Sequence, residues 1–167
     1  MAEYYAASSG IAGSGSAQKL VSIENPTGSG IEVLVKKCVV SGVANAVSST
    51  IFYYHLGRTT ATPTSGTTLT GQQQDSASAA PAAIVRQGPT ATAAAGQIWA
   101  GSPGVVLGAL LSAAAALAPS QAPIFDDSGN PSDGFLLMEG EGLLISVDAN
   151  STAWSHSVAL RWQESGP

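Results

Sequence analysis

The sequence predicts an all-β protein, a jelly-roll-like β-sandwich with a flexible N-terminal arm and at most one short helix. Three strands follow one another, at residues 135–138, 143–147 and 155–162. In the last of them, Val158, Leu160 and Trp162 alternate with smaller or polar residues, which is typical of a strand with one buried face. Other short strand-like segments, joined by Gly- and Pro-rich turns, precede them, and no repeat of fixed period is present. This pattern favours a sandwich or jelly roll over a propeller or solenoid.

The domain boundary is predicted at the start of the chain. Residues 1–18 are rich in Gly and Ser, which offer little to pack, so we expect a mobile arm that is dispensable for folding. Tyr4 and Tyr5 near its tip each present an apolar ring with a hydrogen-bonding hydroxyl, and we expect them to dock on another subunit. A disordered tail is the alternative. Residues 19–167 are predicted to form a single β-sandwich domain.

The first strands of this domain are marked by turn residues and alternation. A strand at residues 20–23 ends at the turn-forming sequence Asn-Pro-Thr-Gly-Ser-Gly of residues 25–30. Residues 31–40 alternate until Lys36 and Lys37, where the break indicates a bulge or a sheet edge.

The middle of the chain has weaker signals. Residues 58–83 contain almost no large apolar side chain, which predicts a long loop or an extended surface excursion. Pro103 and Pro119 confine any helix between them to a few turns. The elements predicted here are strands at residues 50–56, 84–86, 97–100 and 105–107, and a short helix at residues 109–117.

Composition excludes several classes of function. Charged residues make up 10% of the chain, against roughly 25% in an average protein, so surface burial in an assembly is expected. Six Lys and Arg residues are spread along a chain of net charge −5, so no basic patch for nucleic acid is expected. The longest apolar run, residues 105–118, is shorter than the roughly 20 residues of a membrane-spanning helix. No secretory signal is evident at the N-terminus, which predicts synthesis in the cytoplasm.

The residue types needed for catalysis do not form a recognisable motif. His55 and His156 have no second histidine at metal-binding spacing, and no nucleophile elbow, phosphate loop or dinucleotide fingerprint is present. The single cysteine, Cys38, lies in an apolar run and is expected to be a buried, inert thiol. We therefore assign no catalytic residue, cofactor or metal.

One acidic segment and three tryptophans were considered as binding sites. The loop from Asp126 to Asp133 is rich in oxygen ligands, but it lacks the spacing of a calcium-binding loop and is also typical of an exposed turn. Among Trp99, Trp154 and Trp162, the last continues the apolar face of its strand and is expected in the core. Trp154 opens that strand beside a polar loop, so it is the tryptophan expected at the surface, in an interface or as a platform for a sugar.

Two stretches of the chain resemble structural proteins of tailed bacteriophages. They are LVSIENPTGSGIEVLVKKCVVS, near the N-terminus, and GFLLMEGEGLLISVDANSTAWSHSVALRWQE, at the C-terminus. The resemblance covers residues 20–40 and 134–164 and rests on turn and strand patterns. It implies a small jelly-roll or sandwich module on a capsid, head fibre or tail tip, often trimeric, with no active-site residues to transfer.

These observations lead to three hypotheses. The first is a non-enzymatic capsid decoration (cementing) protein that binds the major capsid protein outside the head, assembled in the host cytoplasm and located on the virion. The second is a tail-tip or fibre module that binds a host receptor or glycan through Trp154 and residues 58–83. The third is an enzyme on a β scaffold, for which the sequence offers no converging polar residues. Tyr4, Tyr5 and Trp154 are the predicted interface residues.

The low charge and the resemblance together predict that the isolated protein is a homotrimer. A chain with so few charges is expected to hide surface, and modules of the kind it resembles associate around a threefold axis. Native mass spectrometry at micromolar concentration should detect three copies, and a stable monomer would contradict the prediction.

Overall fold

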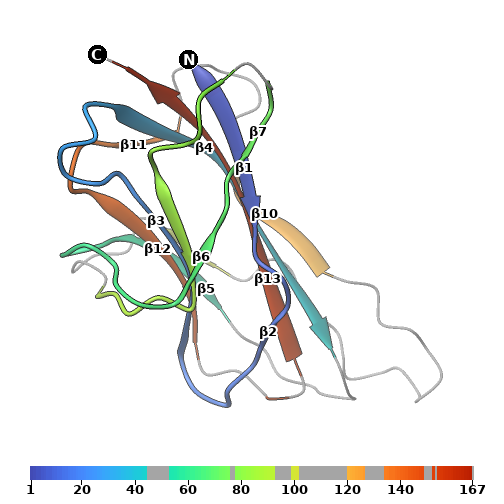
Figure 1. Cartoon of the computed structure of the whole chain (residues 1–167). Coiled ribbons are helices and arrows are strands. Elements are labelled where there is room, and N and C mark those ends of the chain that lie inside the picture. The colour runs from blue at the N-terminus through green and yellow to red at the C-terminus, as the bar shows by residue number, and fades with distance from the viewer. Residues whose placement is uncertain are drawn as a thin grey trace.

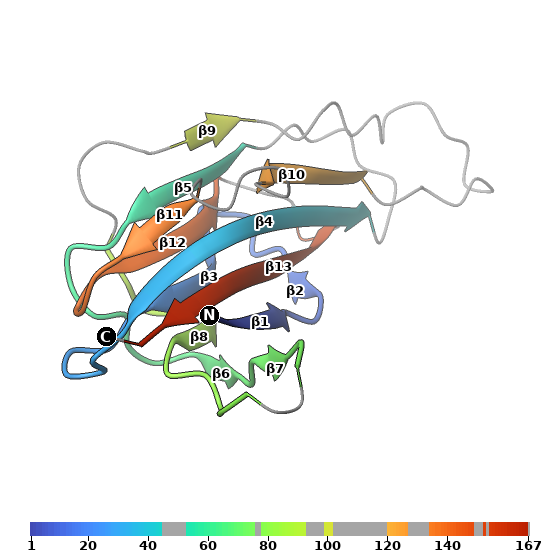
Figure 2. The same ribbon diagram turned by 90° about the horizontal axis from the view of Figure 1, so that it is seen from above.

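Two antiparallel sheets face each other in the structure, which is a computed structural model (Figures 1 and 2). It describes residues 1–44, 53–75, 78–92, 99–101, 120–126, 134–148, 152 and 154–166. Over these residues the secondary structure is all-β, which confirms the predicted β-sandwich. The jelly-roll connectivity stays a prediction. The described residues include no helix long and apolar enough to cross a membrane.

The first sheet has seven strands and is built around the two longest, β4 and β13. Its order is β10-β4-β13-β1-β7, with β11 also beside β4 and β2 also beside β13. The strands are β1 (Ala2–Ala7), β2 (Ile11–Ala12), β4 (Glu32–Ala44), β7 (Gln72–Gln73), β10 (Ser120–Asp126), β11 (Phe135–Leu137) and β13 (Trp154–Ser165).

The second sheet has six strands in the order β6-β8-β3-β12-β5-β9. They are β3 (Gln18–Glu24), β5 (Tyr54–Arg58), β6 (Thr67–Leu69), β8 (Ile84–Gln87), β9 (Trp99–Gly101) and β12 (Gly142–Val147). The predicted strands at residues 20–23, 84–86, 135–138 and 143–147 are thus confirmed.

The core lies between the sheets and follows the alternation seen in the sequence. Along β13 the buried positions are every second residue, from Trp154 to Glu164, and the positions between them are half-buried. Cys38 on β4 is buried as expected, and burial raises the pKa of its thiol. The largest other core side chains come from both sheets and include Leu20, Ile23, Tyr54, Leu56, Leu137, Leu143 and Ile145.

The break in alternation at the two lysines is a β-bulge in the centre of the sheet. Arg161 on β13 pairs with Lys37, whereas the next residue, Trp162, pairs with Val35, so Lys36 is the extra residue. A bulge shifts the side chains beyond it by one position. As a result Cys38 points inward and Lys37 outward.

The middle of the chain is more regular than predicted. Residues 58–83 were expected to be a loop, but they contain β6 and β7 and a bridge between Thr64 and Thr90. The pairing there uses main-chain hydrogen bonds, which small polar residues can make without an apolar face. The predicted helix at residues 109–117 and strand at residues 105–107 lie outside the described residues, as do Asp127 and Asp133.

The prediction of a flexible N-terminal arm is wrong for residues 2–7, which form β1. This strand lies between β13 and β7, and its pairs with β13 run from Ala2 opposite Glu164 to Ala7 opposite Ala159 (Figure 2). Tyr4 is only 2% exposed, and its ring stacks on Trp162 with 5.7 Å between centroids. Tyr4 is the one aromatic side chain of β1 that points into the core. Its stacking on Trp162 holds this strand in place, although most other side chains of the strand are small.

A buried carboxylate completes this part of the core. Glu164 Oε1 accepts hydrogen bonds from Trp162 Nε1 at 3.0 Å and from Ala83 N at 2.9 Å, and its Oε2 accepts one from Ala82 N at 3.0 Å. The Tyr4 hydroxyl donates to Ala79 O at 2.8 Å. The segment before β8 is therefore hydrogen-bonded to β1 and β13 through two side chains, Tyr4 and Glu164.

The turns at one end of the sandwich are bound to each other by side chains. The Glu139 carboxylate accepts hydrogen bonds from the backbone N–H of Gly28, at 3.0 Å, and of Gly30, at 2.6 Å. Asn25 is fully buried, and its Nδ2 donates to Ile31 O and Leu137 O. Both glycines have positive φ values, 78° and 68°, which L side chains rarely adopt. The glycines of this turn therefore allow two N–H groups to converge on one carboxylate.

The role of β1 predicts a contrast between neighbouring tyrosines. Replacement of the buried Tyr4 by Ala should lower the free energy of unfolding by about 3 kcal/mol or more, because it leaves a cavity against Trp162. Tyr5→Ala, on the outer face of the same strand, should cost less than about 1 kcal/mol. Urea unfolding of the two variants measures both values, and equal stabilities would show that β1 does not belong to the fold in solution.

A second prediction concerns His156, which is fully buried on β13. Burial lowers its pKa from 6.5 to about 4, and its Nδ1 lies 2.9 Å from the Tyr54 hydroxyl. The unfolded chain therefore binds a proton between pH 6.5 and 4 that the folded chain does not, so stability should fall as the pH falls through this window. The contribution of His156 should be about 2 kcal/mol smaller at pH 5 than at pH 7.

The variant His156→Gln isolates this effect from other titrating groups. Burial also raises the pKa of Glu24, so the folded chain binds a proton more readily than the unfolded chain at this carboxyl. Glu24 therefore increases stability as the pH falls, which opposes the effect of His156. Urea unfolding of both proteins at pH 7 and pH 5 should show a loss in the parent that the variant lacks. The same pH dependence in both would rule out His156 as its source.

Candidate functional site

The three predicted interface residues do not lie together on the surface. Tyr4 and Trp154 are 2% and 1% exposed, so both belong to the core and the interface role predicted for them is wrong within this chain. Each occupies an inward position of its strand, although the residues around each in the sequence suggested a surface position. Tyr5 is 49% exposed on the outer face of the seven-stranded sheet, as the prediction requires.

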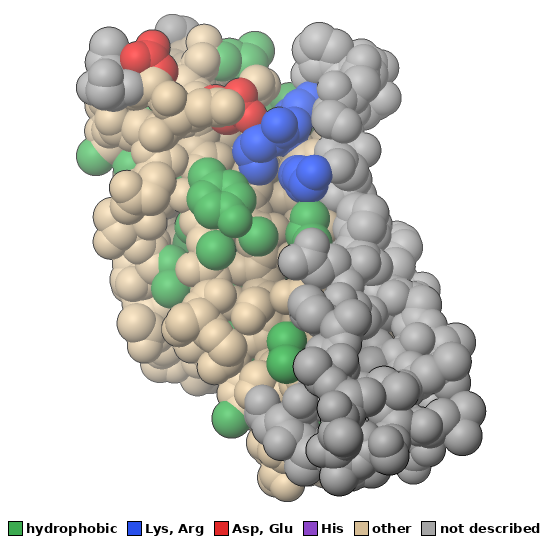
Figure 3. Space-filling model, turned by 90° about the vertical axis from the view of Figure 1, so that its right-hand side faces the viewer, with side chains coloured by type: hydrophobic (Ala, Val, Ile, Leu, Met, Phe, Trp, Pro, Cys, Tyr) green, Lys and Arg blue, Asp and Glu red, His purple; other side chains and the backbone are tan. Residues whose placement is uncertain are grey.

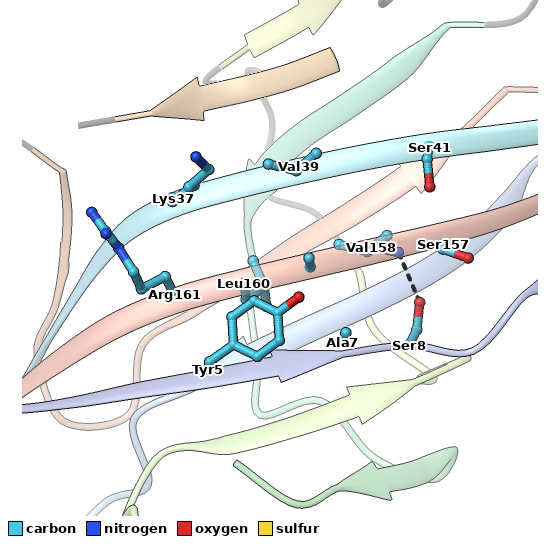
Figure 4. A pocket seen from close by; sticks show the side chains of 11 residues that line it. Tyr5, Ala7, Ser8, Lys37, Val39, Ser41, Ser157, Val158, Leu160 and Arg161 are labelled. Atoms are coloured by element: carbon cyan, nitrogen blue, oxygen red, sulfur yellow. Dashed lines mark hydrogen bonds between the residues drawn. The ribbon is translucent and has the colours of Figure 1, made fainter. Parts of the chain in front are cut away.

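Tyr5 borders a shallow hollow of about 580 Å³ on that outer face. The hollow crosses β1, β13 and β4, and Figure 4 shows the side chains that line it. Lys37, Arg161 and Tyr5 stand at one end, and three serines stand at the other. The described lining residues include no histidine and no carboxylate: they are Tyr5, Ala7, Ser8, Lys37, Val39, Ser41, Ser157, Val158, Ala159, Leu160 and Arg161.

The hollow exists because small side chains meet there. Ala159 on β13 is paired with Ala7 on one side and with Val39 on the other, so three adjacent strands present little bulk. Ser8 extends the pairing beyond β1: its N–H donates to Val158 O, and its Oγ accepts from Val158 N, both at 2.8 Å. The floor of the hollow is thus the backbone of β13 around Val158, whose N–H and C=O groups are both hydrogen-bonded to Ser8.

The charges at the edge of the hollow are partly balanced. Arg161 Nε lies 3.1 Å from Glu3 Oε1, a pair between neighbouring strands β13 and β1. Lys37 is on the outer face because of the bulge at Lys36. Figure 3 faces this side of the molecule and shows the Lys and Arg side chains as one group beside hydrophobic side chains. The residues that line the hollow are mostly uncharged, and its two cations, Lys37 and Arg161, lie at the same end as Tyr5.

Groups with acid–base chemistry lie elsewhere. His156 is in the core, and His55 is on the second sheet, where its Nε2 lies 2.7 Å from Asp148 Oδ1. No group of three or more His, Cys, Asp or Glu side chains among the described residues could hold a metal ion. The outer face around Tyr5 is suited to contact with another surface.

No family model, curated protein or solved structure matches this chain.

Sequence reasoning found Tyr5 but missed the other residues around the hollow. Lys37, Val39 and Ala159 are all outward positions of strands whose inward positions were recognised as core. The alternation that marked the inward residues of these strands also marks the residues between them as outward. The sequence did not reveal the register that places β1, β13 and β4 side by side.

Proposed function

We propose that the protein is a non-enzymatic structural protein of a virion, a capsid decoration protein that attaches to the outside of the head and stabilises it. The observation that carries the proposal is the outer face of the seven-stranded sheet around Tyr5. It offers one exposed aromatic ring at the end of a hollow lined mostly by small, uncharged side chains, and aromatic residues next to a well-packed surface are typical anchors of protein interfaces. The partner on this face is the major capsid protein, with the decoration protein acting as a homotrimer.

The position of the two phage-like stretches supports the proposal. Residues 20–40 and 134–164 supply most of β3, β4 and β13 and all of β11 and β12. β12 pairs with β3 in one sheet, and β13 pairs with β4 in the other. The resemblance therefore falls on the central pair of strands in each layer.

The tail-tip hypothesis loses one of its two candidate regions. Trp154 was the residue expected to stack on a sugar, but it is 1% exposed and packs in the core. Tyr5 remains exposed beside a shallow hollow lined mostly by uncharged side chains, which favours a protein surface as the partner.

Attachment is tested by comparing capsids with and without the protein. A ligand that binds the assembled shell and not its free subunits stabilises the shell by about 2.7 kcal/mol at a hundredfold excess over Kd. Capsids that carry the protein should therefore withstand higher temperature and osmotic shock. Equal stability of bare and decorated capsids would contradict decoration and favour the tail-tip hypothesis.

Variants on the outer face test where attachment occurs. Tyr5→Ala should weaken binding to capsids by about 2 kcal/mol, which is roughly a thirtyfold rise in Kd, because an anchoring aromatic ring is lost. Ala7→Glu should weaken it as well, since a charge would be buried in the contact. Thr67→Glu, on the exposed strand β6 of the other sheet, is the control with the same change of charge and should bind normally.

The salt dependence of attachment distinguishes this contact from one made by ion pairs. Because most side chains that line the hollow are uncharged and Arg161 already pairs with Glu3, binding should change little between low and high ionic strength. A steep loss of binding in high salt would assign attachment to a different, charged surface.

A further inference from the structure

The second sheet has a separate cleft of about 340 Å³ on its outer face, away from the hollow around Tyr5. It crosses β3, β12 and β5, three neighbouring strands, and Ala91 and Thr92, which follow β8 in the sequence, also line it. The volume is in the lower part of the range of small-molecule sites, the size that holds a single sugar ring.

A row of three polar side chains crosses the cleft. Ser146 on β12 is paired with Lys19 on β3 and with His55 on β5. Residues directly opposite each other on neighbouring strands share a face and lie about 5 Å apart at their Cβ atoms. A β-bulge between Ile145 and Ser146 skips Leu20, and it is this skip that puts Lys19 opposite the serine. Bulges often re-aim side chains in this way next to functional sites.

A carboxylate stands at one end of the row. Asp148 Oδ1 lies 2.7 Å from His55 Nε2, and the Asp148 backbone N–H donates to Tyr53 O at 3.0 Å. The Asp148 side chain is 52% exposed, so its carboxylate can also accept hydrogen bonds from a ligand. The pairing with His55 holds its position.

The opposite end of the row is cationic. Lys19 is exposed, and no ion pair among the described residues involves it. Between the two ends, the hydroxyls of Ser146 and Thr92 line the cleft together with the apolar side chains of Leu144 and Ala91. The cleft therefore presents a cation, hydroxyl groups, an apolar surface and an acceptor carboxylate.

We propose that this cleft binds a sugar acid, a monosaccharide unit that carries a carboxylate. The carboxylate of the sugar lies at the Lys19 ammonium, and its ring hydroxyls donate to Asp148 and exchange hydrogen bonds with Ser146 and Thr92. This binding does not depend on capsid attachment, because the two sites lie on the outer faces of different sheets.

The test is a titration of the full-length ¹⁵N-labelled protein with sodium glucuronate, at constant ionic strength, followed by amide shifts. The amides of Lys19, His55, Ser146 and Asp148 should shift and saturate. Glucose, which lacks the carboxylate, and acetate, which lacks the ring, should each bind at least tenfold more weakly. No saturable shift, or acetate binding as tightly as glucuronate, would overturn the proposal.

Two variants separate recognition from a general effect of charge. Lys19→Met should raise the Kd for glucuronate at least tenfold, whereas Thr67→Glu, with the same change in net charge, should leave it within twofold. Both positions are exposed, so an unchanged melting temperature confirms that each variant is folded. An unchanged Kd in Lys19→Met would overturn the proposal.

The same titration with an oligosaccharide that ends in glucuronate identifies the source of the ligand. Binding of either form supports the site. Tighter binding of the oligosaccharide assigns the cleft to the end of a glycan chain, and tighter binding of the monosaccharide assigns it to a free metabolite.

Discussion

The pairing of β4 with β13 is the constraint on which the rest of the molecule depends. These are the longest strands, and β13 pairs with β4 along its whole length, from Trp154 to Ser165. Its inward residues form a continuous buried row, and its other edge is the template for β1 and β2. Pairing strands that are far apart in the sequence costs loop-closure entropy. The long β4–β13 ladder offsets this cost, because several other strands pair with it once it has formed.

The C-terminal end of this ladder explains why the N-terminus belongs to the fold. The stacking of Tyr4 on Trp162 and the three hydrogen bonds to Glu164 bring together β1, β13 and the segment before β8. A buried carboxylate is tolerated when its oxygens are satisfied by donors, and here two of the donors are backbone N–H groups of that segment. The polar middle of the chain is thus anchored by a few specific contacts, although its own side chains supply little apolar surface.

The two outer faces of the sandwich have different character, and both owe it to bulges. In the first sheet the bulge at Lys36 turns Lys37 outward beside Arg161 and leaves small side chains around Tyr5. In the second sheet the bulge that skips Leu20 aligns Lys19 with Ser146. The proposed attachment surface and the proposed sugar-acid cleft are therefore on opposite sides of one core, so one partner does not block the other.

The sequence by itself determined the class of fold and the inward and outward positions of the main strands, because alternation with a period of two is a local property. Val158, Leu160 and Trp162 were recognised as core for this reason, and the two lysines as a break that indicates a bulge or a sheet edge. The same alternation, continued to the start of β13, also places Trp154 on the inward side. Only the tertiary structure decided that Tyr4 is buried, and that Lys19, Ser146 and His55 form one row. Those results depend on the register between strands far apart in the chain, and register is set by the packing of the whole core.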